Sequence, residues 1–561
     1  MSTCPYPVPL PACGEGRKTL LPRKRGRSGG GHPAILACLL VLIALTAGSC
    51  QTHSYDIEPD TIRVHMPQDP ILLNPVISED AYSNVVCSRI FESLLERDRK
   101  TLKMKGMIAE KWTIGADKLT YTFKLRRNIV FHDGKPLTSA DVLYSYEMLM
   151  SEKIPNAHKK VYYKDVQSVS APDSYTVVFR MKKPYAMALE HLGGFEVIPK
   201  HIYSQGDFMK DERNLRGPVG SGPYRFVEWK TGQRVTLTRF DSYWGEKPEI
   251  RKLDFIIIKN DAVALQALKK GDVDSYNLRP LQWTRQTNSE KFARDFQKIK
   301  YLATSYRYIG YNMRREPFND RRVRTAMAHL MDLERVKRTI LEGLVEVTTG
   351  PFLPQSLQYN KKLPPLEFNP EKAIALLKEA GYARDANGML AKNGRPLEIE
   401  LMFPAGGGFA DQMVSVIKED FSRVGINVQP RKLEFQTMLT KINERDFQAV
   451  MLGWSSGIES DPFQLWHTSQ REKGHNFTGF GDAASDALIE QARLTFDDAQ
   501  RNAIYHKFHE RVYYEQPYTF LFTSYALLAV SKRFTNVHVY PLGLDMLEWK
   551  LRAQADTHTG N

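Results

Sequence analysis

Cysteine is scarce in this chain of 561 residues. Of its five cysteines only Cys87 lies outside residues 1–50, and the others are Cys4, Cys13, Cys38 and Cys50. A single cysteine cannot form a disulfide within the rest of the chain, and it cannot supply a Cys/His metal framework. We therefore expect no internal disulfide and no metal site, and we expect no cofactor.

A concentrated basic arm is also missing. The chain has 78 basic and 64 acidic residues, a formal net charge of +14, and residues 1–50 hold six of the basic residues and one acid. The other basic residues are scattered among acids, without the stripe that follows a phosphate backbone, so we predict no nucleic-acid partner. With 42% hydrophobic and 25% charged residues, the composition is that of a globular protein, and the length predicts two to four domains.

The N-terminal region has no hydrophobic run long enough to span a membrane. Its apolar stretch, residues 34–47, has 14 residues, whereas a spanning helix needs about 20. A basic run from Arg23 to Arg27 precedes it, which is the arrangement of a secretory signal. We therefore predict that residues 1–50 are a signal peptide and that the protein is exported.

The signal segment ends in Ala47-Gly48-Ser49-Cys50, which resembles a bacterial lipobox, although Ala47 stands where Leu, Val or Ile is usual. This resemblance predicts that Cys50 is lipidated and anchors the mature protein to a membrane surface without a spanning helix. Cleavage by an ordinary signal peptidase is the alternative. The expected location is the periplasmic or cell-surface face of a membrane.

Strand-like and helix-like patterns alternate through the body of the chain, which favours a mixed α/β fold. Residues 121–125 alternate apolar and polar side chains, as a half-buried strand does, and Asp133-Gly134 is a turn signal. Thr138 and Asp141 have the spacing of a capping box, which predicts a helix through Met150.

A second helix is predicted after Asn369-Pro370, a pair typical of an N-cap and a first helical position. Apolar residues then recur at helical spacing as far as Ala380, and Gly381 is expected to end the helix. Residues 447–452 have the pattern of a buried strand.

Ordered sequence blocks between about residues 60 and 550 resemble the family 5 extracellular solute-binding proteins, which are the peptide, oligopeptide and nickel receptors of bacterial ABC importers. The blocks are Leu73-Asn74-Pro75, Ala109-Glu110-Lys111-Trp112, residues 119–126, residues 131–138, Gly220-Ser221-Gly222-Pro223-Tyr224, Tyr243-Trp244, Pro317-Phe318-Asn319-Asp320 and residues 373–381. They occur in the order that the family has.

The resemblance implies an α/β fold of the type II periplasmic-binding-protein class, a bilobed Venus-flytrap with an additional inserted domain. It places a discontinuous domain I in residues 56–95, 218–310 and 525–554, the inserted domain II in residues 96–217, and domain III, the second lobe, in residues 311–524. Two hinge strands would let the lobes close on a ligand in an interdomain cleft.

The function implied by the resemblance is that of a non-enzymatic receptor. It would capture peptides or similar polar solutes and deliver them to the permease and ATPase subunits of an ABC importer. We expect it to act as a monomer held at the membrane surface by its lipid anchor. A binding protein that acts in regulation, without a permease, is an alternative.

The segment from Gly453 to Pro462 is expected to contact the ligand. In peptide-binding relatives a tryptophan here is followed three residues later by an aspartate that binds the ligand's ammonium, whereas this chain has Trp454 followed by Gly457. Either Glu459 or Asp461 supplies the missing carboxylate, or the ligand lacks that positive charge. Trp454 would offer a stacking face, and Ser455 a hydrogen-bonding partner.

The same segment, Gly453-Trp454-Ser455-Ser456-Gly457, formally matches the nucleophile elbow of a secreted serine hydrolase. The elbow requires a strand, a tight turn and a helix that begins at the serine. Because Gly457 and Asp461-Pro462 follow closely, we expect an irregular loop at this point instead of a helix.

Further ligand-binding candidates are aromatic or polar residues expected near the cleft. Trp466-His467 resembles a pair found in one branch of the family and combines stacking with hydrogen bonding. The remaining candidates are Tyr82, Tyr224 and Tyr306. For each of these residues, packing within the core is the alternative role.

Overall fold

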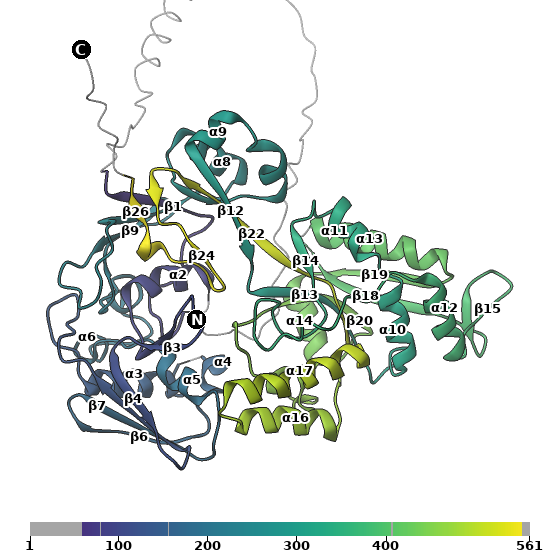
Figure 1. The fold of residues 1–561 in the computed structure, drawn as a ribbon, viewed down its shortest axis with the longest axis horizontal. Coiled ribbons are helices and arrows are strands. Elements are labelled where there is room, and N and C mark those ends of the chain that lie inside the picture. The colour runs from purple at the N-terminus through teal and green to yellow at the C-terminus, as the bar shows by residue number, and fades with distance from the viewer. Residues whose placement is uncertain (1–58, 79, 155, 406–407, 553–561) are drawn as a thin grey trace, which may run out of the picture.

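The computed structural model describes residues 59–552 apart from residues 79, 155, 406 and 407. The expected signal peptide and Cys50 lie outside the described residues. Two bodies of unequal size make up this part of the chain, as Figure 1 shows. We call residues 59–302 and 522–552 the first lobe, and residues 305–520 the second lobe.

The upper part of the first lobe is built on an eight-stranded sheet of order β12-β22-β11-β1-β10-β9-β8, with β14 paired to β22. In this sheet β1 runs parallel to β10 and β11, and the remaining strand pairs are antiparallel. The strands are β1 (Thr61–Met66), β8 (Tyr224–Lys230), β9 (Arg234–Arg239), β10 (Lys252–Ile257), β11 (Ser275–Asn277), β12 (Phe296–Leu302), β14 (Val345–Val347) and β22 (Phe522–Ser531). Helices α2 (Ala81–Ile90), α8 (Asp261–Lys270) and α9 (Glu290–Asp295) pack on it.

The lower part of the first lobe is an antiparallel sheet of order β4-β5-β7-β6. Its strands are β4 (Ala109–Ile114), β5 (Thr120–Leu125), β6 (Val166–Asp173) and β7 (Thr176–Met181), with the small pair β2 (Leu95–Arg97) and β3 (Met104–Gly106) nearby. Helices α3 (Ser139–Met150), α4 (Ala157–Lys160), α5 (Ala188–Gly194), α6 (Lys200–Tyr203) and α7 (Glu212–Arg216) complete this part.

Three local predictions in this region are confirmed. The alternating segment forms β5, whose side chains are alternately buried and more exposed. Gly134 adopts a positive φ of 85° in the predicted turn. Helix α3 begins at the predicted capping box, in which Asp141 accepts a hydrogen bond from the Thr138 amide at 2.9 Å, and it ends at Met150.

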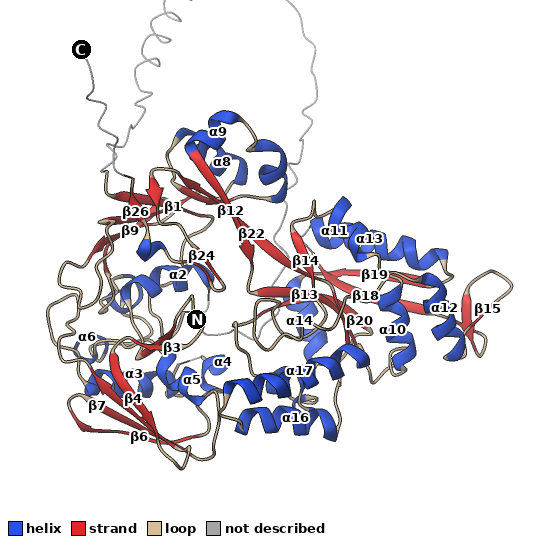
Figure 2. Cartoon of the chain, viewed as in Figure 1, coloured by secondary structure: helices blue, strands red, loops and turns tan. Residues whose placement is uncertain are grey.

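The second lobe is built on a five-stranded sheet of order β19-β18-β20-β13-β21, in which β18 is parallel to β19 and β20. Its strands are β13 (Ser305–Tyr311), β18 (Glu398–Pro404), β19 (Asn427–Leu433), β20 (Ala449–Ser455) and β21 (Tyr518–Phe520). Its helices are α10 (Arg321–His329), α11 (Leu333–Thr339), α12 (Pro370–Glu379), α13 (Gly408–Arg423), α14 (Phe435–Asn443), α15 (Phe463–Trp466), α16 (Ala483–Leu494) and α17 (Asp498–Glu515). Figure 2 shows the helices on both faces of this sheet.

Two sequence expectations in the second lobe have direct outcomes. Helix α12 begins at Pro370 behind its N-cap Asn369 and ends before Gly381, whose φ is 92°, as predicted. The strand expected at residues 447–452 is present as β20, but it begins later, at Ala449, and continues through Ser455. Trp454 and Ser455 therefore lie at the end of a central strand, and both line the cavity that faces the first lobe.

The chain passes between the lobes twice, from β12 to β13 and from β21 to β22. Both connections are short, and β14 of the second lobe pairs with the start of β22 beside them. Two adjacent connections of this kind let one lobe rotate against the other about a common axis. Within the described residues, no helix has the length and apolar character needed to cross a membrane.

Candidate functional site

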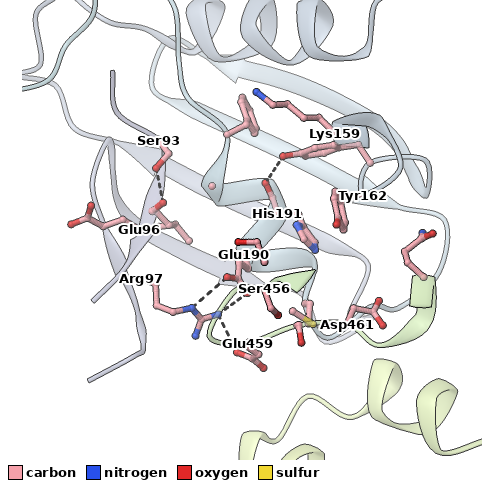
Figure 3. A pocket seen from close by; sticks show the side chains of 18 of the residues that line it. Ser93, Glu96, Arg97, Lys159, Tyr162, Glu190, His191, Ser456, Glu459 and Asp461 are labelled. Atoms are coloured by element: carbon pink, nitrogen blue, oxygen red, sulfur yellow. Dashed lines mark hydrogen bonds and ion pairs between the residues drawn. The ribbon is translucent and has the colours of Figure 1, made fainter. Parts of the chain in front are cut away.

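A cavity of about 200 Å³ lies between the two lobes. The first lobe contributes residues around β2 and α5, including Arg97 and His191, and the second lobe contributes β20 and the loop that follows it. Figure 3 shows side chains from both lobes converging on this space. A cavity enclosed by two bodies that share a hinge is a common form of small-molecule site.

The second lobe supplies an aromatic wall. Strands β13 and β20 pair so that Tyr306 lies opposite Trp454, which places both side chains on the same face of the sheet. Trp454 is 1% exposed and stacks between Tyr308 and Phe477, with ring centroids 6.3 and 6.1 Å away. Its Nε1 donates to the Tyr518 hydroxyl at 3.3 Å. Packing therefore fixes Trp454 in place where it reaches the cavity.

Tyr306 has an unusual hydroxyl. Its side chain is 1% exposed, and the hydroxyl has no hydrogen-bond partner among the described residues. Burial raises the pKa of this phenol well above its ordinary value, so it stays protonated and can donate. A buried hydroxyl without a partner is costly, and a ligand or a water in the adjoining cavity would satisfy it.

A network of ion pairs joins the lobes at one end of the cavity. We call the pairs of Arg97 with Glu190 and Glu459, and of Arg501 with Glu459, the ionic relay. Arg97 of β2 lies 2.6 Å from Glu190 of α5 and 3.0 Å from Glu459 of the second lobe, as Figure 3 shows. Arg501 of α17 binds the other oxygen of Glu459 at 2.8 Å. Burial opposes the charge on Arg97, but Glu190 and Glu459 outweigh it and raise the pKa of the guanidinium. Glu459 is therefore shared between two arginines.

A second set of polar contacts crosses the interface at Asp461. The Tyr185 hydroxyl of the first lobe donates to Asp461 Oδ2 at 2.9 Å, and Arg493 Nε forms an ion pair with the same oxygen at 3.0 Å. The Ala186 amide also donates to the Arg493 carbonyl at 2.7 Å. Burial, and then the charge of Asp461, raises the pKa of Tyr185 well above its ordinary value. The contacts of Tyr185 and Ala186 join the lobes, and Arg493 neutralises Asp461 within the second lobe.

His191 lies in the wall contributed by the first lobe. Its ring stacks on Tyr162, with centroids 4.5 Å apart, and on Tyr185 at 5.9 Å. Burial lowers the pKa of His191 to about 4, so the imidazole is neutral near pH 7. It presents an uncharged hydrogen-bonding ring to the cavity.

The structure brings six of the nine predicted ligand-binding residues to this cavity: Tyr306, Trp454, Ser455, Glu459, Asp461 and Trp466. It does so because β13, β20 and the loop after β20 form one edge of the second lobe. The carboxylates of Glu459 and Asp461 reach the cavity as expected, but arginines already neutralise both.

The other three predicted residues lie away from the cavity. Tyr224 is 2% exposed, and its hydroxyl donates to the Ile250 carbonyl within the core of the first lobe. Tyr82 is half-buried on α2 against the same core. His467 stacks on Phe463, and its Nε2 lies 3.2 Å from Glu490 Oε1. These three side chains are held by packing and by polar contacts within their own lobes.

Sequence reasoning did not identify the polar residues of the first lobe. Arg97, Glu190, His191 and Glu196 all line the cavity, yet no motif marks them. Arg97 pairs with Glu190, which is 93 residues away in sequence, and with Glu459 of the second lobe, so no local spacing could have indicated this part of the cavity. Glu459 and Asp461, in the loop after β20, were the one sequence feature that could have indicated cationic partners such as Arg97.

The geometry at Ser455 differs from that of a nucleophile elbow. Strand β20 continues through Ser455, and the next helix, α15, begins only at Phe463. The Ser455 hydroxyl donates to the Thr304 carbonyl at 3.4 Å. The irregular segment expected between them is present. Within the described residues, no group of three or more His, Cys, Asp or Glu side chains is placed to hold a metal.

One known protein family matches a long continuous stretch of the chain. The model of the family described as bacterial extracellular solute-binding proteins, family 5 Middle, matches residues 103–476. The chain belongs to this family. Family 5 members are substrate-binding proteins, and the resemblance seen in the ordered sequence blocks is thereby confirmed.

Individual family 5 proteins align over most of the chain. The oligopeptide-binding protein AppA of Bacillus subtilis is 30% identical over 483 residues, which are 84% of this chain and 88% of that protein. A dipeptide-binding protein of Escherichia coli is 26% identical over 81% of this chain and 87% of its own length. The solved structure of Bacillus subtilis AppA with a nonapeptide has a TM-score of 0.71 at 28% identity, covering 88% of this chain and 99% of that chain. The expected bilobed α/β fold of the type II class is confirmed.

Proposed function

We propose that this family 5 protein is the receptor of an ABC importer that captures peptides or similar polar solutes between its lobes. The observation that carries the proposal is the cavity itself, which both lobes enclose beside two adjacent chain connections. The similarity to a protein named for oligopeptide binding, solved with a nonapeptide, supports peptides as the class of solute.

The cavity walls suit a ligand with polar and apolar parts. Trp454, Tyr306 and Phe352 offer apolar faces, while Ser93, Ser456 and Gln464 offer hydrogen-bonding groups. Hydrogen bonds to the main chain of a peptide do not depend on its side chains, and water-filled pockets accept side chains of different kinds. Broad specificity is therefore expected. Closure over the ligand would present it to the permease in one defined conformation.

Calorimetric titration with a synthetic peptide library tests this proposal. We expect saturable binding of a subset of peptides with a stoichiometry of one, and mass spectrometry should recover the peptide unchanged. We propose that the protein is not an enzyme, so it should not react with a fluorophosphonate at Ser455. Turnover of the bound peptide, or the absence of binding to every peptide, would contradict the proposal.

The cellular arrangement is part of the same proposal. A permease and an ATPase would receive the ligand, and the protein would act as a monomer anchored through Cys50. Radioactive palmitate should label the wild type and not a Cys50→Ala variant, and equal release of both into buffer would contradict the anchor. The division into domains I, II and III stays a prediction.

A further inference from the structure

Four of the five carboxylates that line the cavity are already neutralised. Glu190 and Glu459 bind Arg97, and Asp461 binds Arg493. Glu96 lies 2.7 Å from Lys105 Nζ near the outer surface. A carboxylate that is paired with a protein cation gains little from a ligand cation, because the existing pair must first be broken. The loop after β20 is therefore poorly suited to bind an ammonium group.

Glu196 is the fifth carboxylate and differs from the others. Among the described residues, no side chain forms an ion pair or hydrogen bond with its carboxylate. Lys159, a cation on the same cavity wall, instead donates its ammonium to the Pro75 carbonyl at 2.6 Å. Since Glu196 is half-buried, leaving its charge unpaired is unfavourable unless something in the cavity compensates it.

The backbone fixes the direction of Glu196. Its residue pairs with Ser93 in an isolated antiparallel bridge, and the Val197 amide donates to the Glu92 carbonyl at 2.8 Å. The flanking residues Phe195 and Val197 are 6% and 0% exposed, so their side chains point into the core. Side chains alternate along extended backbone, so Glu196 points to the opposite side. Paired residues on adjacent strands project to the same side, and Ser93 and Glu196 both line the cavity.

The charge of Glu196 acts on its surroundings at this end of the cavity. Burial is the main cause that raises the pKa of the Cys87 thiol and of the Tyr163 phenol, and the negative charge of Glu196 adds to both effects. His191, in the same wall, is neutral near pH 7 and does not offset this charge. The Lys159 ammonium acts on Cys87 in the opposite direction, but it is bound to the Pro75 carbonyl and forms no ion pair with Glu196.

We propose that the Glu196 carboxylate binds an ammonium group of the ligand, which makes the ligand a peptide or similar polar solute with a free amine. This inference rests on the proposed function, since it names which part of the solute is recognised and by which residue. The aromatic ring of Tyr162 also lines the cavity, and an aromatic face stabilises an adjacent cation. The role is distinct from that of Glu459 and Asp461, which bind arginines and join the lobes.

The test compares amine-bearing and amine-blocked probes. Wild type, Glu196→Gln and Glu96→Gln are titrated by calorimetry with a synthetic tripeptide library and with the same library N-acetylated. Glu96→Gln is the matched control, because it removes a cavity carboxylate that Lys105 already neutralises. We expect the wild type to prefer free amines by at least tenfold, Glu196→Gln to lose that preference, and Glu96→Gln to keep it. Thermal melting within about two degrees of wild type confirms that each variant is folded.

The outcomes separate this inference from the proposed function. If wild type binds free and acetylated peptides equally, or if Glu196→Gln keeps the preference, the inference is wrong while the receptor function stands. If no peptide binds, the receptor proposal for peptides fails, and a panel of amino acids and polyamines is titrated instead. Binding of an amine to wild type but not to Glu196→Gln would then support the site, and binding of none would overturn it.

Discussion

Arg97 Nη2 of the first lobe lies 3.0 Å from Glu459 Oε2 of the second lobe. The side chains are 15% and 18% exposed, so solvent screens their attraction less than it would at the surface. Arg501 forms a second ion pair with Glu459, and Glu190 forms a second ion pair with Arg97. The relay thus favours the closed arrangement of the lobes before any contact with a ligand is counted.

Loss of this relay should weaken binding through the closing equilibrium. Arg97→Ala removes charge-assisted contacts that are typically worth about 1.5–3 kcal/mol. Because apparent affinity falls with the fraction of closed protein, we expect roughly tenfold weaker binding of every ligand, measured by calorimetry. Lys105→Ala is the control, since its pair with Glu96 is about half exposed and should contribute little. Unchanged affinity in Arg97→Ala would show that the relay does not govern closure.

The loop carboxylates should not discriminate amines. Glu459→Gln and Asp461→Asn weaken contacts between the lobes. Each substitution should therefore lower the affinity for free-amine and for N-acetylated peptides by the same factor. Calorimetry with the two peptide sets checks this expectation. A loss confined to the free-amine set would instead assign ammonium binding to that loop.

Trp454 should act mainly as a packing residue. The side chain is 1% exposed between Tyr308 and Phe477, so Trp454→Ala opens a cavity in the core. We expect the free energy of unfolding, measured in urea, to fall by about 3–5 kcal/mol. The exposed Ser455 supplies the control, because Ser455→Ala should change stability by less than about 0.5 kcal/mol. A small loss in Trp454→Ala would mean that the aromatic wall is not tightly packed.

Stability should depend on pH through three histidines, of which His509 is buried and the other two are half-buried. Burial lowers the pKa of His132, His191 and His509 to about 4, below the ordinary 6.5 of the unfolded chain. Between about pH 6.5 and 4 the unfolded state therefore binds more protons, and these residues make stability fall as the pH falls. Glu92, whose pKa burial raises to about 7, acts in the opposite direction between pH 7 and 4.5.

Replacing His191 isolates its share of this pH dependence. The slope of unfolding free energy against pH is proportional to the difference in protons bound by the unfolded and folded states. In His191→Asn this difference should fall by up to one proton between about pH 6.5 and 4, which lowers the slope by up to about 1.4 kcal/mol per pH unit. Urea unfolding from pH 4.5 to 7 provides the measurement. His538→Asn, at an exposed position, should leave the slope unchanged. Identical slopes in wild type and His191→Asn would refute a buried neutral imidazole.

The sequence was sufficient where structure depends on local chemistry. The capping box at Thr138 and the pair Asn369-Pro370 specify helix starts because the groups that cap a helix lie within a few residues of it. The strand that ends at Ser455 was predicted to end too early, at residue 452, since the irregular composition of the next residues hid its pairing with β13. That pairing is long-range and leaves no local signal.

The cavity could be predicted only in part for the same reason. Trp454 and the loop acids were identified from a resemblance, and they do line the cavity. Arg97 and Glu196 reach it only because the first lobe closes on the second, and no spacing in the sequence encodes that approach. The aromatic candidates Tyr82 and Tyr224 belong to a core whose packing is set by the whole sheet.

Hydrogen–deuterium exchange with and without the tightest-binding peptide tests the central claim, that ligand is held between the two lobes. We predict slower amide exchange in both walls, at residues 93–97 of the first lobe and at residues 455–461 of the second. The same peptide should leave exchange in α12, on the far side of the second lobe, unchanged. Protection confined to one lobe, or to a surface away from the cavity, would contradict the account.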